Sequence, residues 1–268
     1  MRTIVITGGT DGMGAALARH YLRAGERVVV IGRSRAKFDA LTAGAPGAEF
    51  VAADLSLVAE SRRVVAHLRA EYERVDALVL AASFIRQRRV LTAEGHEASW
   101  ALFFLSKYLF VTGLRELLAA APAPVVVNTA VPGARADALD FADLESRERF
   151  RFATSNARQR RANELLGLLA VDADPRMAYY TWGPARLVRT SFAGEVGLGM
   201  KVAAAVLGTV LGQRAETAIV PVVDLLDAPI PGRAAYRGAK QRALVAGPDD
   251  RAEAARLAAA VEQTCAPH

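Results

Sequence analysis

Cysteine is almost absent from this chain, since Cys265 is the single one in 268 residues. One thiol excludes a disulfide within the chain and favours a reducing, cytoplasmic location. Long hydrophobic runs are missing as well. No stretch approaches the roughly 20 apolar residues of a membrane span, and residues 1–7 are too short for a signal peptide's hydrophobic part. We therefore expect a cytoplasmic protein without a membrane span.

Basic runs interleaved with aromatic residues are also lacking, although the net charge is +6, from 34 Lys+Arg against 28 Asp+Glu. Proteins that bind single-stranded nucleic acid use such runs, so we expect no nucleic-acid partner. The excess of arginine suits an anionic cofactor or substrate better. No group of His, Cys, Asp or Glu has metal-ligand spacing, so no metal is expected.

Short apolar runs alternate with helical patterns along the chain. The runs are continuous rather than alternating, which is typical of a parallel sheet buried on both faces. The alternation predicts an α/β fold, a doubly wound, seven-stranded parallel sheet, in a single domain over residues 1–268. The expected strands are 4–6, 28–31, 50–53, 77–80, 125–127, 177–182 and 234–236, and the main expected helices are 15–24, 94–118 and 158–170.

A glycine-rich turn joins the first expected strand to the first helix, and it reads Thr7-Gly8-Gly9-Thr10-Asp11-Gly12-Met13-Gly14. Glycine permits positive φ in a tight turn and lets a pyrophosphate approach the backbone amides. The helix N-terminus that follows adds partial positive charge. The position of this turn in an alternating chain predicts a dinucleotide-binding Rossmann fold.

The spacing of this turn resembles the T-G-x-x-x-G-[Ile/Leu]-G signature of the short-chain dehydrogenase/reductase family, with Met13 in the Ile/Leu place. Asp54-Leu55 resembles the family's Asp-Leu beside the adenine, and Gly183-Pro184 with Thr190 resembles its nicotinamide-binding segment. The cofactor-binding residues that we expect from the turn and from this resemblance are Gly8, Thr10, Asp11, Gly12, Met13, Gly14, Asp54, Leu55, Ala81, Ala82, Arg160, Pro184 and Thr190.

The end of the second expected strand indicates which dinucleotide is bound. NAD-binding proteins place an acidic residue there to hold the ribose hydroxyls. This chain instead has Arg33-Ser34-Arg35, and the first acid is Asp39. Guanidinium groups suit a 2′-phosphate, and the Ser34 hydroxyl adds a donor. We therefore expect NADP(H) rather than NAD.

The four catalytic positions of the family, which are Asn, Ser, Tyr and Lys, are altered here. The Asn position falls on or near Phe103, and the Ser position reads Thr129-Ala130. The pair Ala162-Asn163 resembles the pair after Tyr-x-x-x-Lys in the retinol-dehydrogenase-like branch, which puts the Tyr position on Asn156 and the Lys position on Arg160. The resemblance thus implies an atypical member. We interpret the one Tyr-x-x-x-Lys in the sequence, Tyr236 to Lys240, as accidental.

Losing an acid has a chemical consequence, because acid catalysis of carbonyl reduction contributes roughly 10²–10⁴-fold. Three hypotheses remain open. The protein reduces a hydrophobic small molecule that needs little acid help, such as an iminium or a conjugated enone; or it is a non-redox cyclase, isomerase or dehydratase; or it is a catalytically silent sensor or scaffold.

Few residues of the sequence could supply the missing proton donor. His96 is a candidate acid, and Tyr179 lies on the sixth expected strand near the expected nicotinamide site. We expect Lys107 and Tyr108 to serve in packing or subunit contact. Arg86, Arg88 and Arg89 follow the fourth expected strand, where they either grip an acidic substrate or form a solvated loop.

A glycine-containing apolar segment, about 192–213, lies where the family places a substrate lid, which favours a hydrophobic substrate. The resemblance also implies a homodimer or homotetramer, paired through the helices that follow the fourth and fifth expected strands.

Overall fold

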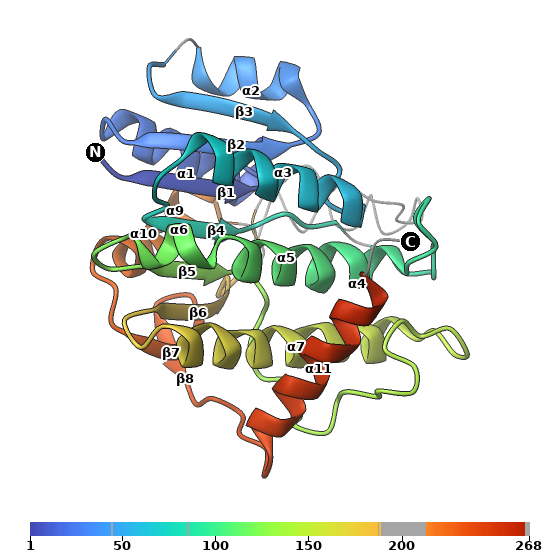
Figure 1. Cartoon of the computed structure of the whole chain (residues 1–268). Coiled ribbons are helices and arrows are strands. Elements are labelled where there is room, and N and C mark those ends of the chain that lie inside the picture. Colours follow the sequence, from blue (N-terminus) through green and yellow to red (C-terminus); the bar gives the residue numbers. More distant parts are fainter. Residues whose placement is uncertain (44, 85, 187, 189–212, 266–268) are drawn as a thin grey trace.

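The computed structural model describes residues 1–43, 45–84, 86–186, 188 and 213–265 (Figure 1). Its elements are β1 Thr3–Thr7, α1 Gly12–Arg23, β2 Arg27–Gly32, α2 Arg35–Thr42, β3 Ala48–Ala52, α3 Val58–Glu71, β4 Ala77–Leu80, α4 Ala98–Trp100, η1 Ala101–Leu105, α5 Ser106–Gly113, α6 Arg115–Ala119, β5 Val125–Asn128, α7 Phe152–Ala173, β6 Ala178–Gly183, α9 Ala215–Ala218, α10 Val220–Asp227, β7 Gly232–Arg237, β8 Lys240–Arg242 and α11 Asp250–Thr264.

The strands form one sheet in the order β3-β2-β1-β4-β5-β6-β7-β8. Pairing is parallel from β3 through β7. The order reverses between β1 and β4, because the chain builds outward to β3 and then crosses back. Connections on either side of such a reversal diverge and leave a crevice beyond the carboxyl ends of the strands. This is the expected Rossmann-type, single-domain α/β fold.

The predicted count of seven strands was wrong, because an eighth strand pairs antiparallel with β7. Arg237 pairs with Lys240, so the loop between them has two residues. Its first residue is Gly238, whose φ of +61° suits the first position of a tight hairpin turn. Tyr236 and Lys240 therefore lie on different strands of a hairpin rather than on one helix.

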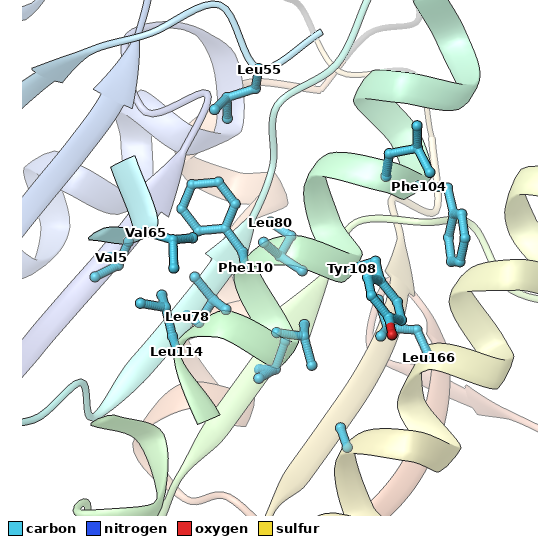
Figure 2. Close-up of a cluster of buried hydrophobic side chains, with 14 of the residues drawn as sticks. Val5, Leu55, Val65, Leu78, Leu80, Phe104, Tyr108, Phe110, Leu114 and Leu166 are labelled. Atoms are coloured by element: carbon cyan, nitrogen blue, oxygen red, sulfur yellow. The ribbon is translucent and has the colours of Figure 1, made fainter. Parts of the chain in front are cut away.

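Alternate strand residues enter two separate cores. One core joins Val5, Leu78 and Val126 to α3, α5, α7 and α11, and Figure 2 shows part of it, including Val65 and Phe110. The other core joins Ile4, Val79 and their neighbours to α1, α9 and α10. Burial on both faces explains why the strands read as continuous apolar runs.

The helices depart from expectation in several places, and α2, α9 and α10 were not predicted. The expected helix 94–118 is divided into α4, the π-helix η1, α5 and α6. The helix expected at 158–170 begins earlier, at Phe152. Sequence reasoning also missed α11, although Ala254, Leu257 and Val261 recur at helical spacing and are buried. In the described part of the chain no helix is long and apolar enough to span a membrane.

Helix α11 crosses over α7 (Figure 1). Arg161 of α7 is 1% exposed, and its guanidinium lies 2.5 Å from carboxylate oxygens of both Asp250 and Glu253. α11 thus covers part of the helix layer through which we expected subunits to pair. Pairing through the helices after β4 and β5 stays a prediction.

We predict that Arg161→Ala destabilises the fold, because it leaves the Asp250 and Glu253 carboxylates without their buried partner. Breaking a buried ion pair typically costs about 3 kcal/mol or more. Urea unfolding followed by far-UV circular dichroism measures the change. The control is Arg251→Ala, which removes an exposed pair with Asp172 and should leave the unfolding midpoint unchanged. Equal midpoints for Arg161→Ala and the native chain would contradict the expectation.

Candidate active site

The glycine-rich turn packs too closely for side chains. A Cβ on Gly14 would lie 2.4 Å from the carbonyl oxygen of Gly8, and a Cβ on Gly8 would lie 2.6 Å from the Cα of Ala82. Gly8 and Gly12 have φ values of +67° and +53°, which favour glycine. The turn therefore brings the end of β1, the start of α1 and the exit of β4 into backbone contact.

A cleft of about 530 Å³ opens beside this turn, at the carboxyl edge of the sheet where the strand order reverses. Its lining contains most of the residues that we expected to bind cofactor, namely Gly8, Thr10, Asp11, Gly12, Met13, Gly14, Arg33, Ser34, Asp54, Leu55, Ala81 and Ala82. Sequence reasoning missed other lining residues, namely Ile31, Gly32, Lys37, Ala53, Ser83, Phe84 and Leu102. The bare backbone and the cations at this cleft fit a dinucleotide phosphate.

Two cations line the cleft just after the end of β2, and one of them differs from expectation. Arg33 lines the cleft and is exposed. Arg35, the other expected phosphate ligand, donates to Asp39 at 2.8 Å instead. Lys37 lines the cleft one helical turn after the N-cap residue Ser34, with its amine 2.5 Å from a carboxylate oxygen of Asp11. The cations that line the cleft are thus Arg33 and Lys37, and Arg35 is not among its lining residues.

Two side chains of α7 hold the loop after β5. Arg160 donates from Nε to the carbonyl of Val131 at 2.6 Å and from Nη2 to the carbonyl of Pro132. Glu164 accepts from the amide of Gly133 at 2.8 Å, and Gly133 has a φ of +91°. Burial lowers the pKa of Arg160 and raises the pKa of Glu164. Two of the donors of Arg160 therefore hold backbone, where the resemblance assigned it to the cofactor.

The remaining tetrad positions follow the same part of the sheet. Asn156 is half-buried on α7, four residues before Arg160. The Thr129 hydroxyl donates to the carbonyl of Leu80 at 3.0 Å. Phe103 lies within η1, and a π-helical turn of this kind is frequent at functional sites. The roles assigned to these positions stay predictions.

A polar network lies beneath the exit of β5, around the buried Asn128. Lys107 donates to Asn128 Oδ1 at 2.7 Å, and Asn128 Nδ2 donates to the Tyr179 hydroxyl at 2.7 Å and to Asn163 Oδ1 at 2.6 Å. Asn163 donates in turn to the Phe103 carbonyl at 2.8 Å. The network joins β5, β6, α5, α7 and η1.

Two expected replacement groups are engaged within the fold. The Tyr179 hydroxyl donates to the carbonyl of Asn163 at 3.0 Å, and burial raises its pKa. His96 Nδ1 lies 3.3 Å from a carboxylate oxygen of Glu145, which raises the pKa of His96. Glu145 also accepts from the Glu97 amide at 2.8 Å. The described lining of the cleft contains neither Tyr179 nor His96.

Other expected site residues have mixed outcomes. Pro184 follows β6 directly and is half-buried, whereas Thr190 and segment 192–212 of the expected lid lie outside the described residues. Arg86 stacks on Phe84 at 4.9 Å, and Arg89 donates to the carbonyl of Glu145 at 3.4 Å. The described residues contain no group of three His, Cys, Asp or Glu side chains that could hold a metal.

The first half of the chain is similar to a known protein family. A family model described as short chain dehydrogenase matches residues 2–135. The Streptomyces protein named "Putative daunorubicin C-13 ketoreductase DnrU" is 32% identical over 123 residues, which are 44% of this chain and 43% of that protein. The Saccharomyces cerevisiae protein "Uncharacterized oxidoreductase YKL107W" is 34% identical over 107 residues, which are 40% of this chain and 33% of that one. The matches thus span less than half of these relatives.

Comparison with solved structures supports the same fold over nearly the whole chain. An alcohol dehydrogenase from Thermococcus sibiricus, complexed with 5-hydroxy-NADP, has a TM-score of 0.64 at 17% identity, covering 91% of this chain and 99% of its own. A short-chain dehydrogenase from Streptomyces avermitilis has a TM-score of 0.64 at 20% identity, covering 98% and 92%. With the family model matching residues 2–135, the chain belongs to the short-chain dehydrogenase family.

Proposed function

We propose that this chain is an atypical NADP(H)-binding oxidoreductase of its family. It transfers hydride to a hydrophobic small molecule that needs little acid catalysis. The observation that carries this proposal is the cleft, where the glycine-rich turn, the N-terminus of α1 and two cations lie together. These are the groups that bind a phosphorylated dinucleotide.

Each part of the cleft has its own task in this proposal. The amides of the turn and the α1 N-terminus hold the pyrophosphate, while Arg33 and Lys37 hold the 2′-phosphate, with Lys37 exchanging its contact with Asp11. Asp54 lies beside the adenosine end, where its carboxylate already accepts from the Ser56 hydroxyl at 2.7 Å. The bound reduced dinucleotide supplies a hydride. The chain orients it along the carboxyl edge of the sheet.

The residues at the family's Tyr and Lys positions support the proposal that this member is atypical. The resemblance puts Asn156 at the proton donor's position, where it can donate a hydrogen bond but no proton. Two of the N–H donors of Arg160 are hydrogen-bonded to the backbone of the loop after β5. Without a placed acid, a ketone would gain an unprotonated alkoxide, which is unfavourable. An acceptor whose new charge is delocalised or neutralised avoids this difficulty.

The names of similar proteins agree with a redox role. One relative is named a ketoreductase and others are named oxidoreductases. Two structural neighbours are complexed with NADP or a derivative of it, among them RhlG of Pseudomonas aeruginosa. These names support NADP(H) as the cofactor and hydride transfer as the reaction class.

We predict that Arg33→Ala and Lys37→Ala each weaken NADPH binding about tenfold to a hundredfold, because each removes a charge-assisted hydrogen bond worth roughly 1.5–3 kcal/mol. NADH binding should hardly change, since NADH lacks the 2′-phosphate. Titration followed by calorimetry measures both affinities. Arg35→Ala is the matched control and should leave both unchanged, because Arg35 pairs with Asp39. Equal weakening of NADPH and NADH would refute the assignment of these cations.

We predict that the purified protein consumes NADPH when supplied with a conjugated enone or an iminium, and that it does not consume NADPH with a simple ketone. The absorbance of the reduced nicotinamide follows the reaction. Product formed without NADPH consumption would favour a cyclase, isomerase or dehydratase instead. NADPH binding with no product from any substrate class would favour a sensor or scaffold.

We predict that the double variant Asn156→Tyr with Arg160→Lys gains ketone reduction of roughly 10²–10⁴-fold, the usual contribution of a placed acid. The control is Asn156→Phe with Arg160→Lys, which adds a ring of similar size but no hydroxyl. Steady-state rates with one aromatic ketone compare the two. Equal rates in both double variants would mean that residue 156 does not occupy the proton donor's position.

A further inference from the structure

Lys107 is the most isolated charged group of the described core. Its side chain is 3% exposed, and its amine donates to Asn128 Oδ1. Among the described residues no carboxylate lies within ion-pair distance of this amine. Burial lowers the pKa of Lys107 to about 7. An apolar residue at this position would give a more stable fold, because a buried amine without a counter-ion loses its hydration.

The place of Lys107 relates it to the cleft. Its partner Asn128 is the last residue of β5, at the carboxyl edge of the sheet. The Lys107 amine lies 5.8 Å from the centre of the Phe103 ring, which packs 5.6 Å from the Phe84 ring. Phe84 lines the cleft. Two aromatic rings therefore separate the amine from the space beside the expected cofactor.

The surrounding elements do little to cancel this charge. β4, β5, β6 and η1 carry no charged residue within their bounds. On α7, Arg158 and Arg161 are paired with carboxylates of other segments, and Arg160 holds the β5 exit loop. Glu164 of the same helix has its pKa raised by burial, which disfavours its charged form.

Because its pKa is about 7, the Lys107 amine is largely protonated at slightly acidic pH, and the charge that it then carries acts over a long range. With few polar groups between them, two unit charges about 10 Å apart still interact strongly enough to change a rate roughly tenfold at an effective dielectric constant near 20. Fixed charges that favour the charge developed in the reaction are a major source of catalysis. A protonated amine beside the exit of β5 would favour products with more negative charge at this edge of the sheet and disfavour cationic substrates.

We propose that Lys107 makes this site selective for α,β-unsaturated carbonyl compounds over iminium ions. This inference rests on the proposed function. Hydride from the dinucleotide forms the new C–H bond at the β-carbon, the C=C electron pair moves toward the carbonyl, and the negative enolate gains the field of Lys107. Water then protonates the α-carbon and leaves as hydroxide. An iminium ion begins positive, so the same field opposes its binding.

The test compares benzylideneacetone with an N-methyl dihydroisoquinolinium ion as acceptors, using NADPH and the full chain. The native protein should prefer the enone. Lys107→Met should lower the enone kcat about tenfold and shift the enone-to-iminium ratio of kcat/KM toward the iminium. Its affinity for NADPH should stay the same, and its melting temperature should equal or exceed that of the native chain.

A second variant separates charge from hydrogen bonding. Lys107→Gln keeps a donor for Asn128 but carries no charge, so it should shift the ratio as Lys107→Met does. An unchanged ratio in both variants, or a native preference for the iminium, overturns this inference and leaves the redox proposal standing. Binding of NADPH without consumption on either acceptor overturns the redox proposal itself, and this inference with it.

Discussion

The contact between the backbones of Gly8 and Gly14 is the constraint on which the rest of this molecule depends. The Cβ of any larger residue at position 14 would lie 2.4 Å from the Gly8 carbonyl oxygen. Because the two meet, α1 starts directly above the end of β1 and points its amide end at the carboxyl edge of the sheet. The exit of β4 closes on the same spot through Ala82. The cleft is the space that remains beside this contact.

The dinucleotide half of the site could be predicted because its signals are local. Glycine at fixed offsets and β-branched runs depend on a few neighbouring residues, and twelve expected lining residues were found together. That Lys37 rather than Arg35 lines the cleft could not be predicted in the same way. It depends on α2 beginning at Arg35, which directs that guanidinium along the helix to Asp39 and brings Lys37 back toward Asp11.

The catalytic half was harder to predict because its contacts join residues far apart in the sequence. Arg160 meets carbonyls 28 and 29 residues away, and Tyr179 meets an asparagine side chain 51 residues away. A short sequence motif cannot reveal contacts between residues so far apart in the chain. The eighth strand and α11 were within reach, since Gly238 and the spacing of Leu257 and Val261 are visible in the sequence. Both follow β7, and the resemblance to the family implies no element beyond that strand.

The costs of folding are not spread evenly over this sheet. Side-chain atoms that are buried without a hydrogen-bond partner in the described structure are Ser61 Oγ, Arg158 Nε, Arg161 Nε, Glu164 Oε2 and Thr181 Oγ1. All but Ser61 lie on α7 or β6, and Lys107 and Asn128 lie on the elements next to them. Buried polar groups without partners lower stability, and natural sequences tend to break such rules at functional sites. On β1, β2 and β3 the described structure has no such unpartnered side-chain atom. The four unpartnered atoms on α7 and β6 lie on the other half, beside the exit of β5, and this supports the proposal that the catalytic groups lie there.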